Sequence, residues 1–235
     1  MAQTITIHWF RQDLRLADNP ALTAAVKAGT VLPVYVLDDD NAGSWKMGGA
    51  SRLWLHHSLS ALNKSLDGKL VLLKGNAAKE IPNLAKDAGA KGVYWNRCYE
   101  PWRINRDKKI KETLKENDID AQSFNGSLLW EPWDVLKDDG TPYKVFTPFY
   151  RKGCLSKAPP REPLKKPALS LAAHKGLSLD DLQLLPHKPE PRWDRAMMFY
   201  STPGEDGAKD ALHGFLDDGL NNYKDGRDYM HGKHS

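Results

Sequence analysis

The sequence predicts a doubly wound α/β fold with a five-stranded parallel sheet, followed by a long linker and the first helix of a truncated all-α domain. In the first half of the chain, short β-branched and aromatic runs alternate with helical stretches of about ten to sixteen residues. A proline-rich segment without sustained periodicity comes next, and a last helix carries an apolar stripe. Strands separated by helices form right-handed crossovers, which give a mostly parallel sheet covered on both faces.

The first strand, helix and second strand form one βαβ unit. Residues 4–10, TITIHWF, are a short apolar run typical of a buried strand, and a charged loop follows them. Asp18 or Asn19 is expected to cap the helix that continues over ALTAAVKAG, with Pro20 in its first turn. VLPVYVLD is the second strand.

The following elements repeat this alternation. In residues 50–66, leucines at positions 55, 59, 62 and 66 are three and four residues apart, so they line one helical face. KLVLLKG is a third strand, AAKEIPNLAKDAGA a helix that we expect Pro82 to interrupt, and KGVYWNR a fourth strand. A helix over residues 103–116 and the strand IDAQSF complete the sheet, with the first strand expected at its centre.

The later sequence changes in character. Eight prolines fall between positions 159 and 203, and so long a segment without regular structure is usually functional or connects two domains. We therefore predict an α/β domain over residues 1–130, an interdomain linker with short helices over 131–203, and the beginning of a helical domain over 204–235.

The last helix has an apolar face that needs partners. Its residues on that face are Ala208, Leu212, Phe215, Leu216 and Leu220. A lone helix with such a stripe has nothing to bury it against. We expect the second domain to be cut off, and the residues after about Pro203 to be poorly packed. A complete protein would be a monomer, whereas the truncated chain would tend to associate.

Composition restricts the class of protein. No segment approaches the run of about 20 apolar residues that crosses a bilayer, and the N-terminus lacks a secretory signal, so we expect a cytoplasmic protein without a membrane partner. Cys98 and Cys154 are far apart and lack neighbouring ligands, which argues against a disulfide framework and a metal site. The net charge of +4 and the basic residues of segment 151–167 permit a polyanionic partner or a solvated linker.

Three common ligand and catalytic motifs are absent. The sequence has no GxGxxG after the first strand, no GxxxxGK[ST] and no nucleophile elbow. Ligands of doubly wound sheets bind beyond the carboxyl ends of the strands, which here are the segments after Phe10, Leu37 and Trp95. The first of these segments, WFRQDLRLADNPAL, interleaves arginines with aspartates.

This segment resembles the opening of a known family. The order W-F-R-x-D-L-R-L-x-D-N-x-A-L after a first strand is similar to class I DNA photolyases and cryptochromes. Further matches follow in register: VYWNRCYEPWRINRD, YKVFTPFYR, and PGE with NNYKDGRDY. The resemblance covers essentially the whole chain, and it implies a Rossmann-like light-harvesting domain at the N-terminus.

The resemblance also implies an activity. Photolyases are flavoproteins and carbon–carbon lyases in DNA repair: light-excited reduced FAD passes an electron to a cyclobutane pyrimidine dimer flipped out of damaged DNA. By resemblance, Tyr223 contacts FAD near its phosphates and Arg227 approaches the lesion in DNA. The family's later flavin-binding segments have no counterpart in this sequence. We therefore assign no catalytic residue and expect this chain alone to be inactive in repair.

In the family, the α/β domain holds an antenna pigment, methenyltetrahydrofolate or a deazaflavin. A pigment site needs an apolar slot with a few convergent polar groups near the strand ends. One folate-binding branch has Asn-Glu after a Tyr-Glu pair, but Trp102 and Arg103 occupy those places here, so either pigment stays open. The candidate antenna residues are Arg11, Asp38, Met47, Arg52, Glu100 and Arg103.

Three functions remain open. We favour a deoxyribodipyrimidine photolyase. The alternatives are a cryptochrome-type blue-light photoreceptor, and a stand-alone pigment- or nucleotide-binding module without catalysis. The tryptophans of the chain are interpreted as packing residues and not as an electron relay, since strand and helix faces are where tryptophan usually packs.

Overall fold

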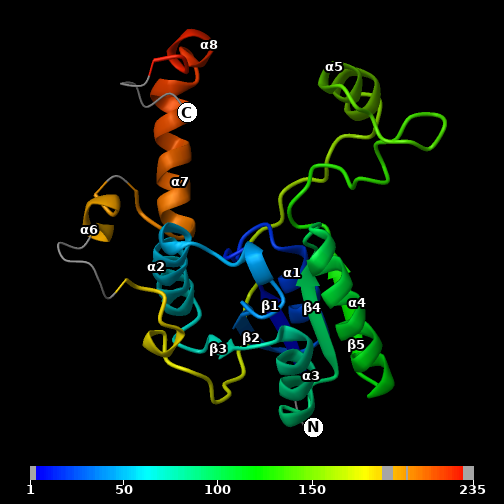
Figure 1. Cartoon of the computed structure of the whole chain (residues 1–235), viewed down its shortest axis with the longest axis vertical. Coiled ribbons are helices and arrows are strands. Elements are labelled where there is room, and N and C mark those ends of the chain that lie inside the picture. Colours follow the sequence, from blue (N-terminus) through cyan, green and yellow to red (C-terminus); the bar gives the residue numbers. More distant parts are fainter. Residues whose placement is uncertain (1–3, 187–192, 200, 230–235) are drawn as a thin grey trace.

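The computed structural model describes residues 4–186, 193–199 and 201–229. Its centre is a sheet of five parallel strands in the order β3-β2-β1-β4-β5 (Figure 1). The predicted fold class is confirmed, and β1 lies in the middle of the sheet as expected. The strands are β1 (Ile5–Phe10), β2 (Thr30–Leu37), β3 (Val71–Lys74), β4 (Gly92–Asn96) and β5 (Asp120–Phe124).

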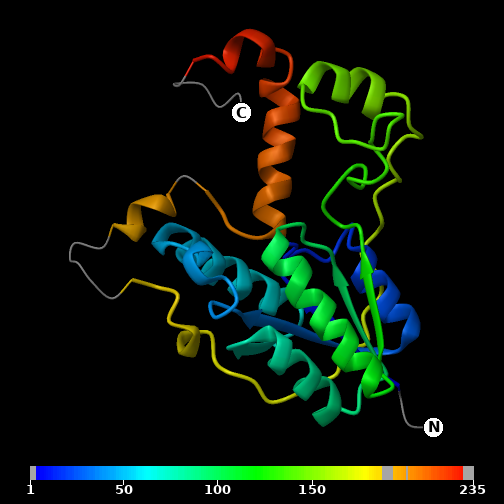
Figure 2. The same ribbon diagram turned by 45° about the vertical axis from the view of Figure 1, so that its right-hand side comes forward.

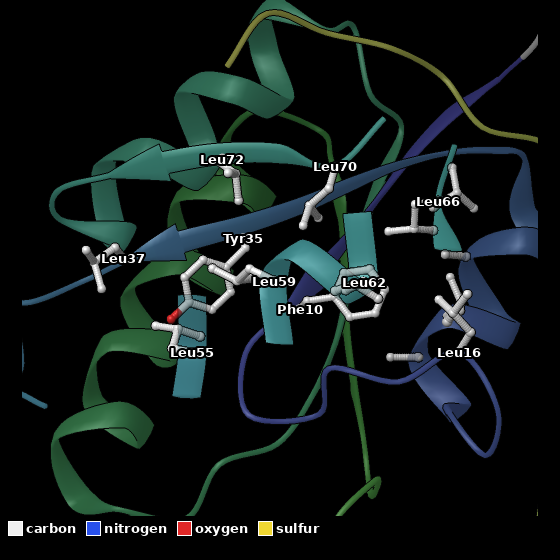
Figure 3. Packing of buried hydrophobic residues seen from close by; sticks show 14 of the residues in the cluster. Phe10, Leu16, Tyr35, Leu37, Leu55, Leu59, Leu62, Leu66, Leu70 and Leu72 are labelled. Carbon is white, nitrogen blue, oxygen red and sulfur yellow. The ribbon is translucent and has the colours of Figure 1, made fainter. Parts of the chain in front are cut away.

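Four helices cover the two faces of this sheet. On one face lie α1 (Pro20–Ala28) and α2 (Gly49–Ser65), and on the other α3 (Ala77–Asp87) and α4 (Pro101–Glu116). The strand side chains therefore enter two separate apolar cores. Figure 3 shows the α2 side, where the leucines at positions 55, 59, 62 and 66 pack with Phe10 and Tyr35, as their helical spacing predicts.

Asn19, and not Asp18, caps α1. The Asn19 side chain accepts a hydrogen bond from the backbone N–H of Leu22 at 3.0 Å, and Pro20 occupies the first turn. Asp18 adopts a φ of 48° and its carboxylate pairs with Arg161 at 2.5 Å. The capping position thus falls on the residue whose backbone is extended, as helix caps require.

The expectation that Pro82 interrupts the third helix is wrong. α3 continues through it from Ala77 to Asp87. The proline removes a single N–H donor, and two other features hold the helix. Asn76 accepts a hydrogen bond from the N–H of Ala78 at 2.9 Å, and Ile81 and Leu84 are buried in the core.

The proline-rich segment adds a short stretch of backbone pairing to the sheet. β3 has four residues and pairs only with Val34–Leu37 of β2. Beside the other half of β2, the N–H of Val31 donates to the carbonyl of Ser170, and the N–H of Ala172 donates to the carbonyl of Val31, both at 2.8 Å. Leu171 thereby forms a parallel bridge with Val31. The segment occupies a position that a longer β3 would otherwise fill.

We call residues 164–184 the strap. After the bridge, the N–H of Leu177 donates to the carbonyl of Leu72 in β3 at 2.8 Å, so the strap also covers the outer edge of the sheet. Leu182 and Leu184 then enter the core beside α2, where each is almost completely buried. Edge strands with unpaired backbone groups invite aggregation, and the strap protects this one.

Two groups of short elements project from the α/β body (Figures 1 and 2). One is α5 (Phe146–Pro148) with η2 (Phe149–Cys154), and the other is the rod of α7 (Glu205–Gly214), η4 (Phe215–Gly219) and α8 (Tyr223–Gly226). Single turns complete the described chain: η1 (Gly43–Trp45), η3 (Asp180–Leu182) and α6 (Asp194–Met197). Throughout the described ranges, the helices are too short or too polar to cross a membrane.

Candidate functional site

A cleft of about 860 Å³ lies beyond the carboxyl ends of β1, β2 and β4. This is the edge at which doubly wound sheets bind ligands. The loop after β1, the turn after β2, the N-terminal halves of α2 and α4, and the first turn of α7 surround it. Its lining includes Arg11, Gln12, Asp13, Leu14, Arg15, Tyr35, Asp38, Met47, Trp54, Leu55, Trp102, Arg103, Arg106, Gly204, Glu205 and Ala208.

The structure brings together four of the six candidate antenna residues in this lining: Arg11, Asp38, Met47 and Arg103. Arg52 lies outside it. Its Nε donates to the carbonyl of Met47 at 3.0 Å and its Nη2 pairs with Asp39 at 2.5 Å, so it supports the turn that carries Met47. Glu100 also lies outside, just before α4, with a carboxylate oxygen 3.5 Å from Nε of Arg103.

Arg11, Arg106 and Asp38 form the floor of the cleft, and Asp107, outside the lining, completes a buried network of two arginines and two aspartates. Nη1 of Arg11 pairs with Asp107 at 2.6 Å. Arg106 pairs with the same Asp107 at 2.9 Å and with Asp38 at 3.1 Å. The formal charges of these four groups sum to zero. Buried charges are tolerated when they are paired and hydrogen-bonded in this way.

Two tryptophan rings lie close to one of these arginines. The guanidinium of Arg106 lies 4.7 Å from the ring of Trp9 and 5.1 Å from the ring of Trp102. Sequence reasoning missed Arg106 and Asp107 as site residues. A signal for Arg106 was available, because Trp102 and Arg106 are four residues apart at the start of a helix that follows a strand end, and residues at this spacing share a helical face.

Arg11 keeps hydrogen-bonding capacity beyond its ion pair. Its side chain is only 4% exposed, yet within the described chain its Nε and Nη2 have no hydrogen-bond partner. Leaving a buried donor unsatisfied costs roughly 1–3 kcal/mol. Both nitrogens are buried in this structure, and the guanidinium carbon of Arg11 lies 5.0 Å from the centroid of the Trp9 ring.

The opposite wall of the cleft is apolar. Met47 packs against the core cluster, and Leu55 and Tyr35 belong to that cluster. Burial raises the pKa of Tyr35, so its phenol stays neutral in the physiological range. A cleft with one apolar wall and a few convergent polar groups is suited to a planar organic ligand.

A second buried network shapes the loop that follows β1. Asp13 accepts hydrogen bonds from the backbone N–H of Arg11 at 3.0 Å and from Nδ2 of Asn96 at 2.5 Å. Nδ2 of Asn19 lies 3.3 Å from Nε2 of His8. Burial is the main cause that lowers the pKa of His8 to about 4, so the imidazole is neutral at pH 7. These polar contacts fix the loop that carries Arg11 into the cleft.

Tyr223 and Arg227, the residues expected to contact FAD and DNA, are outside the cleft. They lie together at the far end of the α7–α8 rod (Figure 1). The guanidinium of Arg227 is 5.6 Å from the ring of Tyr223, and Tyr223 is 40% exposed. The structure therefore separates the two groups of candidate residues, one at the sheet and one on the rod.

A family model described as DNA photolyase matches residues 6–168, which is more than half of the chain. The chain belongs to the DNA photolyase family. The predicted membership of the photolyase and cryptochrome family is thus confirmed, and the matched range includes all of the sheet except Ile5 and most of the cleft lining.

Curated relatives of this photolyase-family chain include both kinds of member. It is 42% identical over 229 residues to a deoxyribodipyrimidine photo-lyase of Agrobacterium fabrum, covering 95% of this chain and 47% of the relative. It is 41% identical over 154 residues to Cryptochrome-2 of Arabidopsis thaliana, covering 64% of this chain and 25% of the relative. The chain thus spans at most about half the length of these two relatives.

Solved structures of photolyases are also similar to this chain. A bacterial class III photolyase from Agrobacterium tumefaciens superposes with a TM-score of 0.91 at 38% identity, covering 100% of this chain and 49% of that one. An archaeal photolyase from Sulfolobus tokodaii, described with two FAD molecules that imply a novel light-harvesting cofactor, superposes with a TM-score of 0.63 at 25% identity. That match covers 84% of this photolyase-family chain and 45% of the other.

Proposed function

We propose that this chain supplies the light-harvesting part of a deoxyribodipyrimidine photolyase and that its cleft holds an antenna pigment. In this proposal residues 1–130 form the antenna domain, 131–203 the linker and 204–235 the beginning of the FAD-binding domain. The observation that carries the proposal is the cleft, where a buried arginine floor faces an apolar wall at the strand ends. The photolyase relative at 42% identity supports the choice of enzyme.

The cleft matches the chemistry of both expected pigments. Both pigments have a planar conjugated ring; the tail of methenyltetrahydrofolate is an anionic glutamate, and a deazaflavin carries a polyhydroxylated side chain. The ring would lie between Trp102 and the apolar wall, since aromatic side chains favour stacked contacts. Arg103, which lines the cleft next to Trp102, would bind a carboxylate of the folate tail.

The proposed roles of Tyr223 and Arg227 concern the complete enzyme. A phenol donates to phosphate oxygens and a guanidinium binds phosphate with two parallel hydrogen bonds. Both side chains are accessible on the rod, which fits contacts to FAD and to damaged DNA. Tyr223 fits the phosphate groups of FAD and Arg227 fits damaged DNA, but neither encloses an isoalloxazine ring, so FAD binding and dimer splitting are proposed for the complete enzyme. FAD, when bound and reduced, supplies the electron for dimer splitting.

The second candidate function is a cryptochrome-type photoreceptor. The identity of 41% to Cryptochrome-2 over 154 residues favours it nearly as much as the photolyase match. Both functions use the same antenna cleft, so the experiment on the cleft tests what they share.

The cleft is tested by titrating the purified chain with methenyltetrahydrofolate and, separately, with a deazaflavin, following absorbance and fluorescence. We expect one pigment to bind with a shifted spectrum. Trp102→Ala should weaken that binding about tenfold, equivalent to about 1.4 kcal/mol, because a stacking face is lost. Trp45→Ala is the matched control, since Trp45 is 81% exposed and is not part of the lining. Failure of both pigments to bind the wild-type chain would refute the proposal.

A further inference from the structure

The first turn of α7 is fastened to the loop after β1 by one carboxylate. Oε2 of Glu205 accepts a hydrogen bond from the backbone N–H of Leu16 at 2.8 Å, and its Oε1 accepts one from the N–H of Ala17 at 3.2 Å. The partners are 189 and 188 positions apart in the sequence. Hydrogen bonds to an ionised acceptor are about twice as strong as neutral ones.

Glu205 is charged at neutral pH. Its partial burial opposes ionisation, but the N–H groups of Leu16 and Ala17 and the ammonium of Lys209 outweigh this, so the pKa of Glu205 lies below its ordinary value. Nζ of Lys209 is 3.3 Å from Oε1 of Glu205, one helical turn further along α7. The carboxylate of Glu205 thus has partners both in the loop after β1 and in α7 itself.

The neighbouring residue makes this docking possible. Gly204 has a φ of 102°, which side chains rarely adopt, and a Cβ there would lie 2.8 Å from the Cβ of Ala61 in α2. Glycine therefore lets the chain approach α2 closely enough to deliver Glu205 to the loop. The glycine therefore allows the first turn of α7 to contact both α2 and the loop after β1.

The rest of the rod is weakly attached to the α/β body. Within the described chain, α7 buries none of its side chains, and Leu212 and Leu216 are 54% and 47% exposed. Figures 1 and 2 show α7 meeting the body at its first turn and extending away from it. The direction of the rod consequently depends on how that first turn is held.

The same turn forms part of the cleft wall. Gly204, Glu205 and Ala208 line the cleft from the rod, and residues 11–15 line it from the loop that leads to Leu16. A ligand that fills this part of the cleft would therefore lie against the rod and against the loop that Glu205 joins. A ligand that binds more tightly when the first turn of α7 contacts the loop stabilises that contact. By reciprocity, the contact strengthens binding of the ligand.

We propose that Glu205 is a positioning residue that latches α7 to the loop at Leu16 and Ala17 and couples the orientation of the rod to occupancy of the cleft. The latch stands on the contacts alone, whereas the coupling rests on the proposed function of the cleft. Because the rod carries Tyr223, the latch would set the geometry between an antenna pigment and the flavin contact. Energy transfer between pigments depends on their distance and relative orientation.

The latch is tested by amide hydrogen exchange of the wild-type chain, Glu205→Ala, Glu205→Gln and Asp206→Ala. We expect exchange of Leu16 and Ala17 to accelerate at least tenfold in Glu205→Ala and less in Glu205→Gln, which keeps one acceptor oxygen. Asp206 is the matched control, because it lies in the same turn with a side chain 95% exposed. Its variant should exchange like the wild type.

Protection of the β1 amides in the same experiment reports whether each variant is folded, and Glu205→Gln keeps the test decisive if Glu205→Ala unfolds. Unchanged exchange at Leu16 and Ala17 in folded variants would overturn the latch.

The coupling is tested with methenyltetrahydrofolate as the probe, or with the deazaflavin if only that pigment binds the wild type. We expect the probe to slow exchange at Leu16 and Ala17, and Glu205→Ala to bind it at least fivefold more weakly than Asp206→Ala does. Equal binding by the two variants would overturn the coupling. If neither pigment binds the wild type, the proposed function of the cleft and the coupling both fail, while the exchange data still decide on the latch.

Discussion

The buried side-chain amide of Asn19 connects three parts of the structure. Its Oδ1 accepts from the N–H of Leu22 at 3.0 Å and from Nδ2 of Asn96 at 2.8 Å, while its Nδ2 donates to the carbonyl of Arg15 at 3.0 Å. One side chain thereby caps α1, ties the end of β4 and fixes the loop that enters the cleft. Buried networks of this kind make a core more rigid when their members are hydrogen-bonded.

His8 should make the stability of the protein sensitive to acid. The pKa of His8 is lowered by burial from 6.5 to about 4, so the unfolded chain binds the proton more readily. Its stabilising contribution is complete above pH 6.5 and is lost as the pH falls toward 4, by up to about 3 kcal/mol. In urea unfolding, His8→Gln should lose less free energy of unfolding than the wild type between pH 6.5 and 4.5. Parallel curves for the two proteins would contradict this.

The sequence could predict some individual residues of the site, but not the residues with which they pair. The positions after β1 and β2 follow from the strand ends, which is why Arg11 and Asp38 were candidates. The partners of these residues were not predictable, because Arg106 meets Asp38 across 68 positions and Asp107 meets Arg11 across 96. Such pairs depend on how the elements pack, and no local spacing records them.

Among the elements, the strands and long helices followed from their periodicity, but the strap did not. Its bridge to β2 uses backbone N–H and C=O groups, which every residue except proline offers. Side-chain pattern therefore carried no sign of it. The proline-rich composition predicted a segment without long elements, yet it gave no information on which edge the segment would cover.

The strap should contribute to stability through its buried leucines. Leu182 is 1% exposed in the core beside α2, whereas Leu177 is 41% exposed on the same segment. Leu182→Ala should lower the free energy of unfolding by about 2–4 kcal/mol, because it removes buried methyl groups and leaves a cavity. Leu177→Ala is the control and should change it by less than about 1 kcal/mol. Denaturant unfolding checks both, and equal losses would show that the strap does not belong to the folded core.

In the molecule as a whole, a compact α/β body carries a rod with an exposed apolar stripe. Leu212, Leu216 and Leu220 are each about half exposed, at 54%, 47% and 50%. Exposed apolar patches promote association. We expect the purified chain to self-associate with rising concentration in sedimentation experiments, and the double substitution Leu212→Glu with Leu216→Glu to shift it toward monomer.

Asp210→Asn is the control for this experiment, since Asp210 is exposed on the same helix but away from the stripe. It should associate like the wild type. A wild-type chain that stays monomeric at every concentration would show that the stripe is not an association surface.

The bridge between Val31 and Leu171 also bears on how the chain folds during synthesis. The ribosome makes β2 well before the strap, so the emerging polypeptide must carry a partly unprotected sheet edge until positions 170–184 have left the exit tunnel. Contacts between residues so far apart in sequence form late, and exposed edges are then open to neighbouring chains. Nascent copies of this protein therefore have a window in which holdase chaperones would raise the yield of native molecules.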